Sequence, residues 1–244
     1  MENYKPTMSF DKAAAEGYDD VSQRGDEMET VAFLEQLAQG GPALELAIGT
    51  GRIALPLANR GIRVGGIDFS SEMIAKLRAK PGAAEIAVTI DNFANVGIKG
   101  TYRLIYLVFN TLFNLLSQDE QVRCFENVAD HLTDDGYFVV ETYVPAFLHR
   151  LRDNQYVDAE AIRVDEVRLD VLRHDTAKQM IEESHVSLSP AGVRLNPVVQ
   201  RYAWPSELDL MARIAGLQLK QRWASWKREE FTSTSSNCIS VYGR

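Results

Sequence analysis

The most restrictive feature of this sequence is a glycine turn that separates an apolar run from a helix-like pattern. The run begins at Ala43, breaks at Gly49-Thr50-Gly51 and continues with apolar residues at helical spacing. Glycines let the backbone of such a turn approach a ligand, and the free N–H groups of the following helix face the same ligand. The stretch GTGRIA also satisfies the loose dinucleotide fingerprint, so the turn predicts a nucleotide-like ligand without identifying it.

Helical and strand-like segments alternate over the first 145 residues. Helical spacing covers residues 28–38, 53–59, 71–79 and 118–131, and strand-like runs begin at residue 43 and cover 62–67, 86–90, 104–109 and 137–142. Ser70 is a predicted N-cap, and Gly136 is predicted to be left-handed in the turn before the last of these strands. With two more strand-like stretches at 218–226 and 237–242, the pattern predicts a doubly wound, Rossmann-like α/β fold with a mostly parallel seven-stranded sheet.

The pattern changes after Pro145. Residues 162–204 alternate apolar and polar side chains, with turn signals near Asp175 and at Pro190-Ala191-Gly192, which predicts an antiparallel meander. A helix is expected at 206–215. We therefore expect an inserted antiparallel lid over residues 149–203 and a core built from residues 38–148 and 204–244. The lid can roof the site at the carboxyl edge of the sheet, and its outward face can pair with a second subunit in a homodimer.

The composition of the chain excludes several classes of binding partner. The formal net charge is −8, which argues against a broad nucleic-acid-binding face, and the longest apolar stretches are too short to span a membrane. The two cysteines, Cys124 and Cys238, show neither disulfide nor metal-ligand spacing, so no metal site is expected. We expect a cytoplasmic protein that acts on a small molecule, without nucleic-acid or membrane partners.

Two carboxylates help to identify the ligand of the turn. Glu45 lies inside the predicted first strand, where a buried charge needs a cationic ligand group or the backbone amides of the loop itself. Asp68 follows the first glycine by 19 residues and ends the second strand, where a carboxylate can accept both ribose hydroxyls. A pyrophosphate beside Glu45 would be unfavourable, so the pair favours an adenosine ligand that carries positive charge over NAD.

Five segments in order resemble the signature segments of class I S-adenosylmethionine-dependent methyltransferases. They are ALELAIGTGR, GIDFSSEMI, VTIDNFANV, LIYLVFNTLFNLL and LTDDGYFVVE. The resemblance covers about residues 31–145 and is strongest to bacterial small-molecule enzymes with an antiparallel lid, which include sugar N-methyltransferases. It implies S-adenosylmethionine as the cofactor, with S-adenosylhomocysteine as its product, and an N-terminal segment, residues 1–37, that closes over the cofactor.

The resemblance also assigns the cofactor site. The methionine part would lie against the glycine turn, the ribose on Asp68, and the adenine beside the ends of the second and third strands. The implied cofactor-binding residues are Tyr18, Arg24, Glu45, Ala47, Gly49, Thr50, Gly51, Asp68, Phe69, Met73, Asp91, Asn92, Phe93, Phe109 and Asn110.

The sequence says less about the methyl acceptor than about the cofactor. Positioning the acceptor in line with the methyl group supplies much of the rate, so a catalytic base is optional. The candidates for catalysis are Asn114, Tyr143 and His149; related sugar N-methyltransferases carry a histidine where this chain has Asn114. We expect transfer to an O, N or C atom of a small molecule, such as a secondary metabolite. The alternatives are an NAD-dependent oxidoreductase and a non-catalytic adenosylmethionine-binding module.

Overall fold

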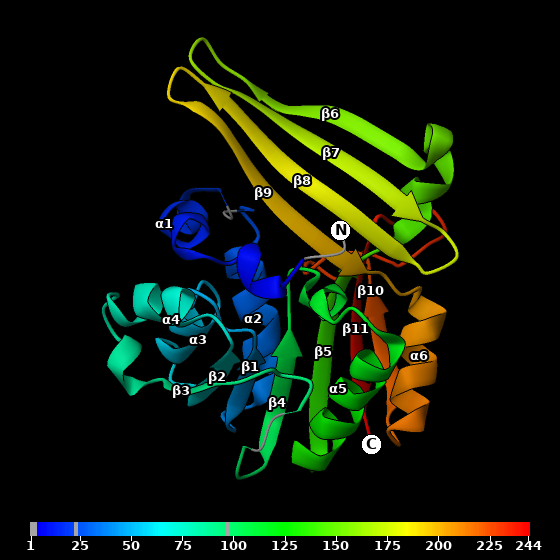
Figure 1. Cartoon of the computed structure of the whole chain (residues 1–244). Coiled ribbons are helices and arrows are strands. Elements are labelled where there is room, and N and C mark those ends of the chain that lie inside the picture. Colours follow the sequence, from blue (N-terminus) through cyan, green and yellow to red (C-terminus); the bar gives the residue numbers. More distant parts are fainter. Residues whose placement is uncertain (1–3, 22–23, 96–97) are drawn as a thin grey trace.

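The computed structural model describes residues 4–21, 24–95 and 98–244. Its main body is a seven-stranded sheet in the order β10-β11-β5-β4-β1-β2-β3 (Figure 1). Strands β1 to β5 are mutually parallel, and β11 pairs antiparallel with both β5 and β10. This confirms the predicted Rossmann-like fold. The strands are β1 Ala43–Leu46, β2 Val64–Asp68, β3 Ala87–Ile90, β4 Tyr102–Leu107, β5 Leu132–Tyr143, β10 Gln218–Trp223 and β11 Asn237–Gly243.

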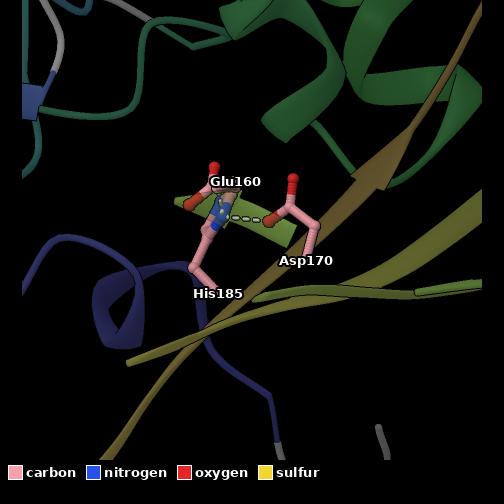
Figure 2. A group of neighbouring side chains, drawn as sticks. All are labelled: Glu160, Asp170 and His185. Atoms are coloured by element: carbon pink, nitrogen blue, oxygen red, sulfur yellow. Dashed lines mark ion pairs between the residues drawn. The ribbon is translucent and has the colours of Figure 1, made fainter. Parts of the chain in front are cut away.

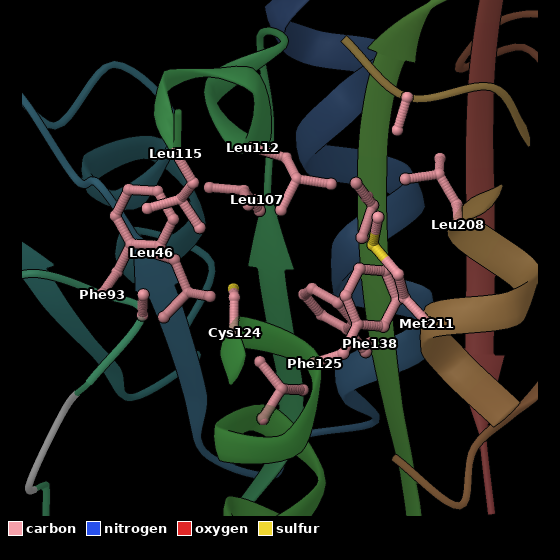
Figure 3. Close-up of a cluster of buried hydrophobic side chains, with 14 of the residues drawn as sticks. Leu46, Phe93, Leu107, Leu112, Leu115, Cys124, Phe125, Phe138, Leu208 and Met211 are labelled. Carbon is pink, nitrogen blue, oxygen red and sulfur yellow. The ribbon is translucent and has the colours of Figure 1, made fainter. Parts of the chain in front are cut away.

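Helices cover both faces of this sheet. One face packs against α2 (Glu27–Ala38), α3 (Ala54–Ala58) and α4 (Ser71–Arg78), and the other against α5 (Gln118–His131) and α6 (Pro205–Ile214). Figure 3 shows the second layer, where strand side chains such as Leu46 and Phe138 meet residues of α5 and α6. Within the described residues, no helix is long and apolar enough to cross a membrane.

Local sequence signals explain where these helices begin. The Ser70 hydroxyl accepts the backbone N–H of Met73 at 3.2 Å, which confirms the predicted N-cap of α4. Ser117 and Glu120 form a reciprocal capping box at the start of α5. These caps fix the elements that follow β2 and β4, and therefore the sheet edge at which the loops gather.

The inserted segment forms a second sheet that projects beyond the carboxyl ends of β4 and β5 (Figure 1). Its strands are antiparallel in the order β6-β7-β8-β9: Gln155–Ile162, Val167–Asp175, Met180–Ser189 and Gly192–Arg201. This sheet, the lid, confirms the predicted meander but contains one more strand at its start, because β6 begins at residue 155 rather than 162. Short 3-10 helices, η4 (Pro145–Arg150) and η5 (Arg152–Asn154), connect β5 to it.

Two local predictions are wrong. Gly136 is not in the left-handed region; it lies within β5, which follows α5 without a turn because Leu132 already pairs with Tyr102 of β4. The strand predicted at 218–226 ends at Trp223, after which the chain turns and Trp223 bridges to Glu230.

The remaining described elements precede the sheet or join its strands. They are η1 (Pro6–Met8), α1 (Lys12–Val21), η2 (Ala83–Glu85) and η3 (Thr111–Asn114).

Candidate functional site

Two loops at the carboxyl edge of the sheet carry strained backbone. After β1, Ala47, Gly49 and Gly51 have φ values of 56°, 54° and 78°, and after β4, Phe109 and Asn110 have φ values of 61° and 62°. Non-glycine residues rarely adopt positive φ, and such residues gather at functional sites. A Cβ atom added to Gly49 would meet open space, so this backbone is bare toward a ligand.

The two strained loops and α1 enclose one cavity. It brings together six residues of the predicted cofactor set and is lined by Tyr18, Glu45, Ala47, Ile48, Gly49, Thr50, Arg52, Ile53, Val108, Phe109 and Thr111. Apolar walls, exposed backbone and the Arg52 side chain suit the methionine part of adenosylmethionine. The residues present therefore fit the cofactor.

Glu45 is buried beside this cavity. Its carboxylate accepts the Tyr106 hydroxyl at 3.0 Å and a hydrogen bond from the backbone of Ala54, at the start of α3. Burial raises the pKa of Glu45 to about 8, although Tyr106 and the charge of Arg52 lower it. Glu45 thus holds the loop in place. This is the second of the two predicted roles, in which Glu45 accepts backbone amides of the loop rather than a cationic ligand group.

Asp68 lies at the end of β2 and is 6% exposed. Its two oxygens accept the backbone N–H groups of Gly49 at 2.7 Å and Ser70 at 2.8 Å. Burial raises its pKa, while these N–H groups lower it. The backbone of Phe69 also donates to this carboxylate. The carboxylate therefore joins the glycine turn to the start of α4.

The residues predicted to lie beside the adenine differ in their burial. Phe69 packs edge-on against Phe10, with ring centroids 5.8 Å apart, whereas Met73 is buried. Asp91 and Asn92 follow β3; the Asp91 carboxylate accepts the N–H of Asn92, and the Asn92 side chain accepts that of Ala94.

Phe93, also predicted to face the adenine, is 3% exposed and packs near Leu46 and Leu115 in the core (Figure 3). The structure thus places it among apolar side chains. Contact between these five residues and the cofactor stays a prediction.

Sequence reasoning missed Glu141, a buried carboxylate near the carboxyl end of β5. One oxygen accepts the backbone N–H of Phe109 at 2.7 Å; the other accepts Arg24 at 2.6 Å and the Trp226 indole at 3.2 Å. The sequence does contain a signal for Glu141: it is a single charged residue within the apolar run FVVETY, just as Glu45 is within ALEL.

Arg52 was also missed, although it follows the glycine turn directly. Its guanidinium pairs with Glu27 at 3.0 Å and lies 5.1 Å from the centre of the Phe109 ring. Arg24 lies 5.3 Å from the same ring centre. Two guanidinium groups therefore flank Phe109 beside the cavity, where a ligand carboxylate would compete for their present partners.

Tyr143 ends β5 under the lid. Its backbone N–H donates to the Asn110 side chain at 2.5 Å, and its hydroxyl donates to Gln200 of β9 at 3.1 Å. Burial raises the pKa of Tyr143, and the charge of Glu183 on β8 raises it further. Tyr143 therefore lies between the β4 loop and the face of the lid that carries Glu183 and Gln200, which we call the inner face.

The inner face is polar beyond Glu183 and carries charges of both signs, with Arg168 and Arg194 in the row after His185. His185 Nδ1 lies 2.5 Å from Asp170 and 3.5 Å from Glu160 (Figure 2). The hydrogen bond to Asp170 and the nearby carboxylates raise the pKa of His185 to about 9, against its burial. The three groups are close enough to share a metal ion, but a protonated imidazole donates to Asp170 and offers no lone pair to a metal.

The other two catalytic candidates contact different parts of the chain. Asn114 is partly buried at the end of η3, next to Phe113, whose ring packs 4.9 Å from that of Tyr143. His149 is exposed in η4 and stacks on Trp204, with ring centroids 5.4 Å apart. Among the described residues, Tyr143 is the candidate that forms hydrogen bonds with both the β4 loop and the lid.

Comparisons with known proteins agree with this geometry. A family model described as a methyltransferase domain matches residues 43–136. The structure of the CcbJ methyltransferase from Streptomyces caelestis is 37% identical, with a TM-score of 0.92 and coverage of 98% of this chain and 99% of that one.

Two further relatives are more distant. The cypemycin N-terminal methyltransferase of Streptomyces sp is 25% identical over 240 residues, which is 96% of this chain and 97% of that protein. The SAM-bound structure of CalS10, an amino pentose methyltransferase from Micromonospora echinaspora, has a TM-score of 0.68 at 17% identity, with coverage of 90% and 91%.

These findings confirm the predicted activity and its cofactor. They do not favour an NAD-dependent oxidoreductase or a non-catalytic module. The chain belongs to the class I S-adenosylmethionine-dependent methyltransferases.

Proposed function

We propose that this enzyme methylates an amine nitrogen of a small molecule bound between Tyr143 and the inner face of the lid. The observation that carries this proposal is the position of Glu183, which lies on the same face of the lid as Gln200, the hydrogen-bond partner of Tyr143. Asp170 and Glu160 extend the negative charge along the same face, and His185 offsets part of it. Arg168 and Arg194 lie on this face one row farther from Tyr143. The acidic part of this face attracts an ammonium group.

The cofactor belongs in the cavity between the two strained loops. We assign its methionine carboxylate to Arg24 and Arg52, its ribose hydroxyls to Asp68, and its sulfonium to the side of Phe109 and Asn110. Support comes from the bare backbone at Gly49 and from the two guanidinium groups beside Phe109. When bound, adenosylmethionine supplies a methyl group on a sulfonium leaving group.

The protein then has two tasks at the acceptor. Tyr143 and the lid hold the nitrogen in line with the methyl group and exclude water. An ammonium acceptor must first lose one proton, and the Glu183 carboxylate is placed to accept it. Burial raises the pKa of Glu183, Asp170 and Glu160 raise it further, and His185 lowers it, so this carboxylate is a stronger base than a solvated glutamate.

The relatives agree with nitrogen as the acceptor atom. The cypemycin enzyme is described as an N-terminal methyltransferase and CalS10 as an amino pentose methyltransferase. Both descriptions name amine-bearing substrates.

A paired acceptor screen tests the proposal. The enzyme is incubated with adenosylmethionine carrying a labelled methyl group and with small primary or secondary amines, each matched by the alcohol of the same skeleton. We expect label on amine nitrogen and none on the matched alcohols. Methylation of the alcohols alone would overturn the assignment of nitrogen.

A further inference from the structure

The lid is polar on its inner face and apolar on the opposite, outer face. The strand pairings place twelve residues of the outer face in three rows across β6, β7, β8 and β9, and Ser184 is the single polar one. The rows are Ile162, Val167, Leu188 and Val193; Ala159, Leu169, Val186 and Leu195; and Val157, Val171, Ser184 and Pro197.

Much of this apolar surface is exposed. Val157, Val193 and Leu195 have exposed fractions of 66%, 69% and 65%, and Ile162 reaches 78%. An antiparallel sheet normally places apolar residues against the core and polar residues in solvent. In the part of the lid that projects away from the core, the apolar residues are on the solvent-exposed outer face instead. This pattern is typical of a sheet whose outer face is covered by another apolar surface.

The charges around this face favour a second copy of the same chain. Within the part of the lid that the structure describes, none of the twelve positions is ionisable. The adjoining row contains Arg173 and Glu182, which pair with each other on neighbouring strands. Two identical faces can therefore meet without bringing like charges together, although each chain carries a formal charge of −8.

We infer that the protein is a homodimer in which the outer faces of two lids stack on each other. Two antiparallel sheets pack face to face about 10 Å apart, and a two-fold axis places the same residues on both sides of such an interface. The strands of the lid are 8 to 10 residues long.

The size of the lid is adequate for a stable dimer. The three apolar rows and the adjoining row lie about 6.8 Å apart along four strands that are about 4.8 Å apart, which gives a face of roughly 500 Å². Two such faces bury on the order of 1,000 Å², the size that a specific interface should reach. The interface leaves both inner faces open to their own active sites, so dimerisation supports the lid without blocking the acceptor.

Sedimentation equilibrium tests the dimer. The wild-type protein should have twice the chain mass of 27.3 kDa at micromolar concentration. The double variant Val157→Glu, Leu195→Glu places charges on exposed outer-face positions and should weaken association at least a hundredfold. Val164→Glu is the matched control, because Val164 is fully exposed in the β6–β7 turn outside the three rows and should leave the dimer unchanged.

Adenosylhomocysteine binding serves as the test of folding, and it should be equal in the wild-type protein and both variants. A wild-type protein that remains monomeric at all concentrations, including one that binds lipid vesicles instead, would overturn the inference. So would a dimer that survives in a folded double variant, because another surface, such as the free edge of β6, would then hold it together. The wild-type mass decides the question even if the double variant does not fold.

Discussion

The Arg24 guanidinium lies 2.6 Å from the Glu141 carboxylate, which joins the segment before α2 to the end of β5. The same carboxylate accepts the backbone N–H of Phe109 in the strained loop after β4. Glu141 is 3% exposed, so it acts as a buried brace between the N-terminal segment and the strained loop after β4.

Replacing Glu141 with Gln should weaken both the fold and cofactor binding. The amide keeps the shape but removes the charge that Arg24 and Phe109 contact, at a cost of about 1–3 kcal/mol in unfolding free energy. We expect adenosylhomocysteine affinity to fall at least fivefold by calorimetry. Asp26→Asn, which alters the other partner of Arg24 at 3.3 Å, is the control and should change the affinity less than twofold. Equal effects of the two variants would contradict the brace.

Substitutions of the two glycines of the turn should affect different properties of the protein. A Cβ at Gly51 would lie 2.4 Å from the Leu77 side chain, so Gly51→Val should chiefly lower the melting temperature. A Cβ at Gly49 meets open space, so the cost of Gly49→Val to the fold is the strain of a β-branched residue at a φ of 54°. In the folded variant, adenosylhomocysteine affinity should fall at least tenfold. Unchanged affinity in folded Gly49→Val would show that the cofactor does not lie on this backbone.

Asp68→Ala should weaken adenosylhomocysteine binding at least tenfold, because charge-assisted hydrogen bonds to ribose hydroxyls contribute roughly 1.5–3 kcal/mol each. The substitution also removes the acceptor for the N–H groups of Gly49 and Ser70. Asp134→Ala, at an exposed carboxylate near the amino end of β5, is the comparison for general loss of negative charge. An Asp68→Ala affinity within twofold of wild type would remove the ribose assignment.

Glu45 should make stability depend on pH. Because its pKa is about 8 in the folded protein and near 4.5 in an ordinary glutamate, the folded state holds a proton that the unfolded chain has released. The resulting stabilisation is complete below about pH 4.5 and is lost as the pH rises through about 8. Between about pH 6 and pH 9, wild type should lose about 1–3 kcal/mol of unfolding free energy relative to Glu45→Gln. Parallel pH curves in urea unfolding would contradict this.

The sequence predicted the core well because its signals are local. The glycine turn, the Ser70 cap and the spacing from Gly49 to Asp68 each depend on a few neighbouring residues, and the structure joins them through the bond from Gly49 to Asp68. Gly136 was misjudged because the pairing of Leu132 with Tyr102, 30 residues away, extends β5 through the expected turn.

The remaining features depend on tertiary contacts. Glu141 was recognisable as a buried charge, but its partner Arg24 lies 117 residues away in the chain. In the lid, alternation separates two sets of side chains without indicating which set faces the core. The hydrogen bond from Tyr143 to Gln200 decides that question, and it puts Glu183 on the face that lies toward Tyr143.

The most direct test of acceptor binding compares Glu183→Gln with Glu182→Gln, two adjacent residues on opposite faces of β8. For a cationic amine that the wild-type enzyme methylates, Glu183→Gln should raise KM at least tenfold and weaken the dependence of kcat on pH, with adenosylhomocysteine affinity unchanged. Glu182→Gln, on the outer face beside Arg173, should leave KM within twofold of wild type. An unchanged KM and pH profile in folded Glu183→Gln would contradict the claim that the inner face of the lid binds the acceptor amine.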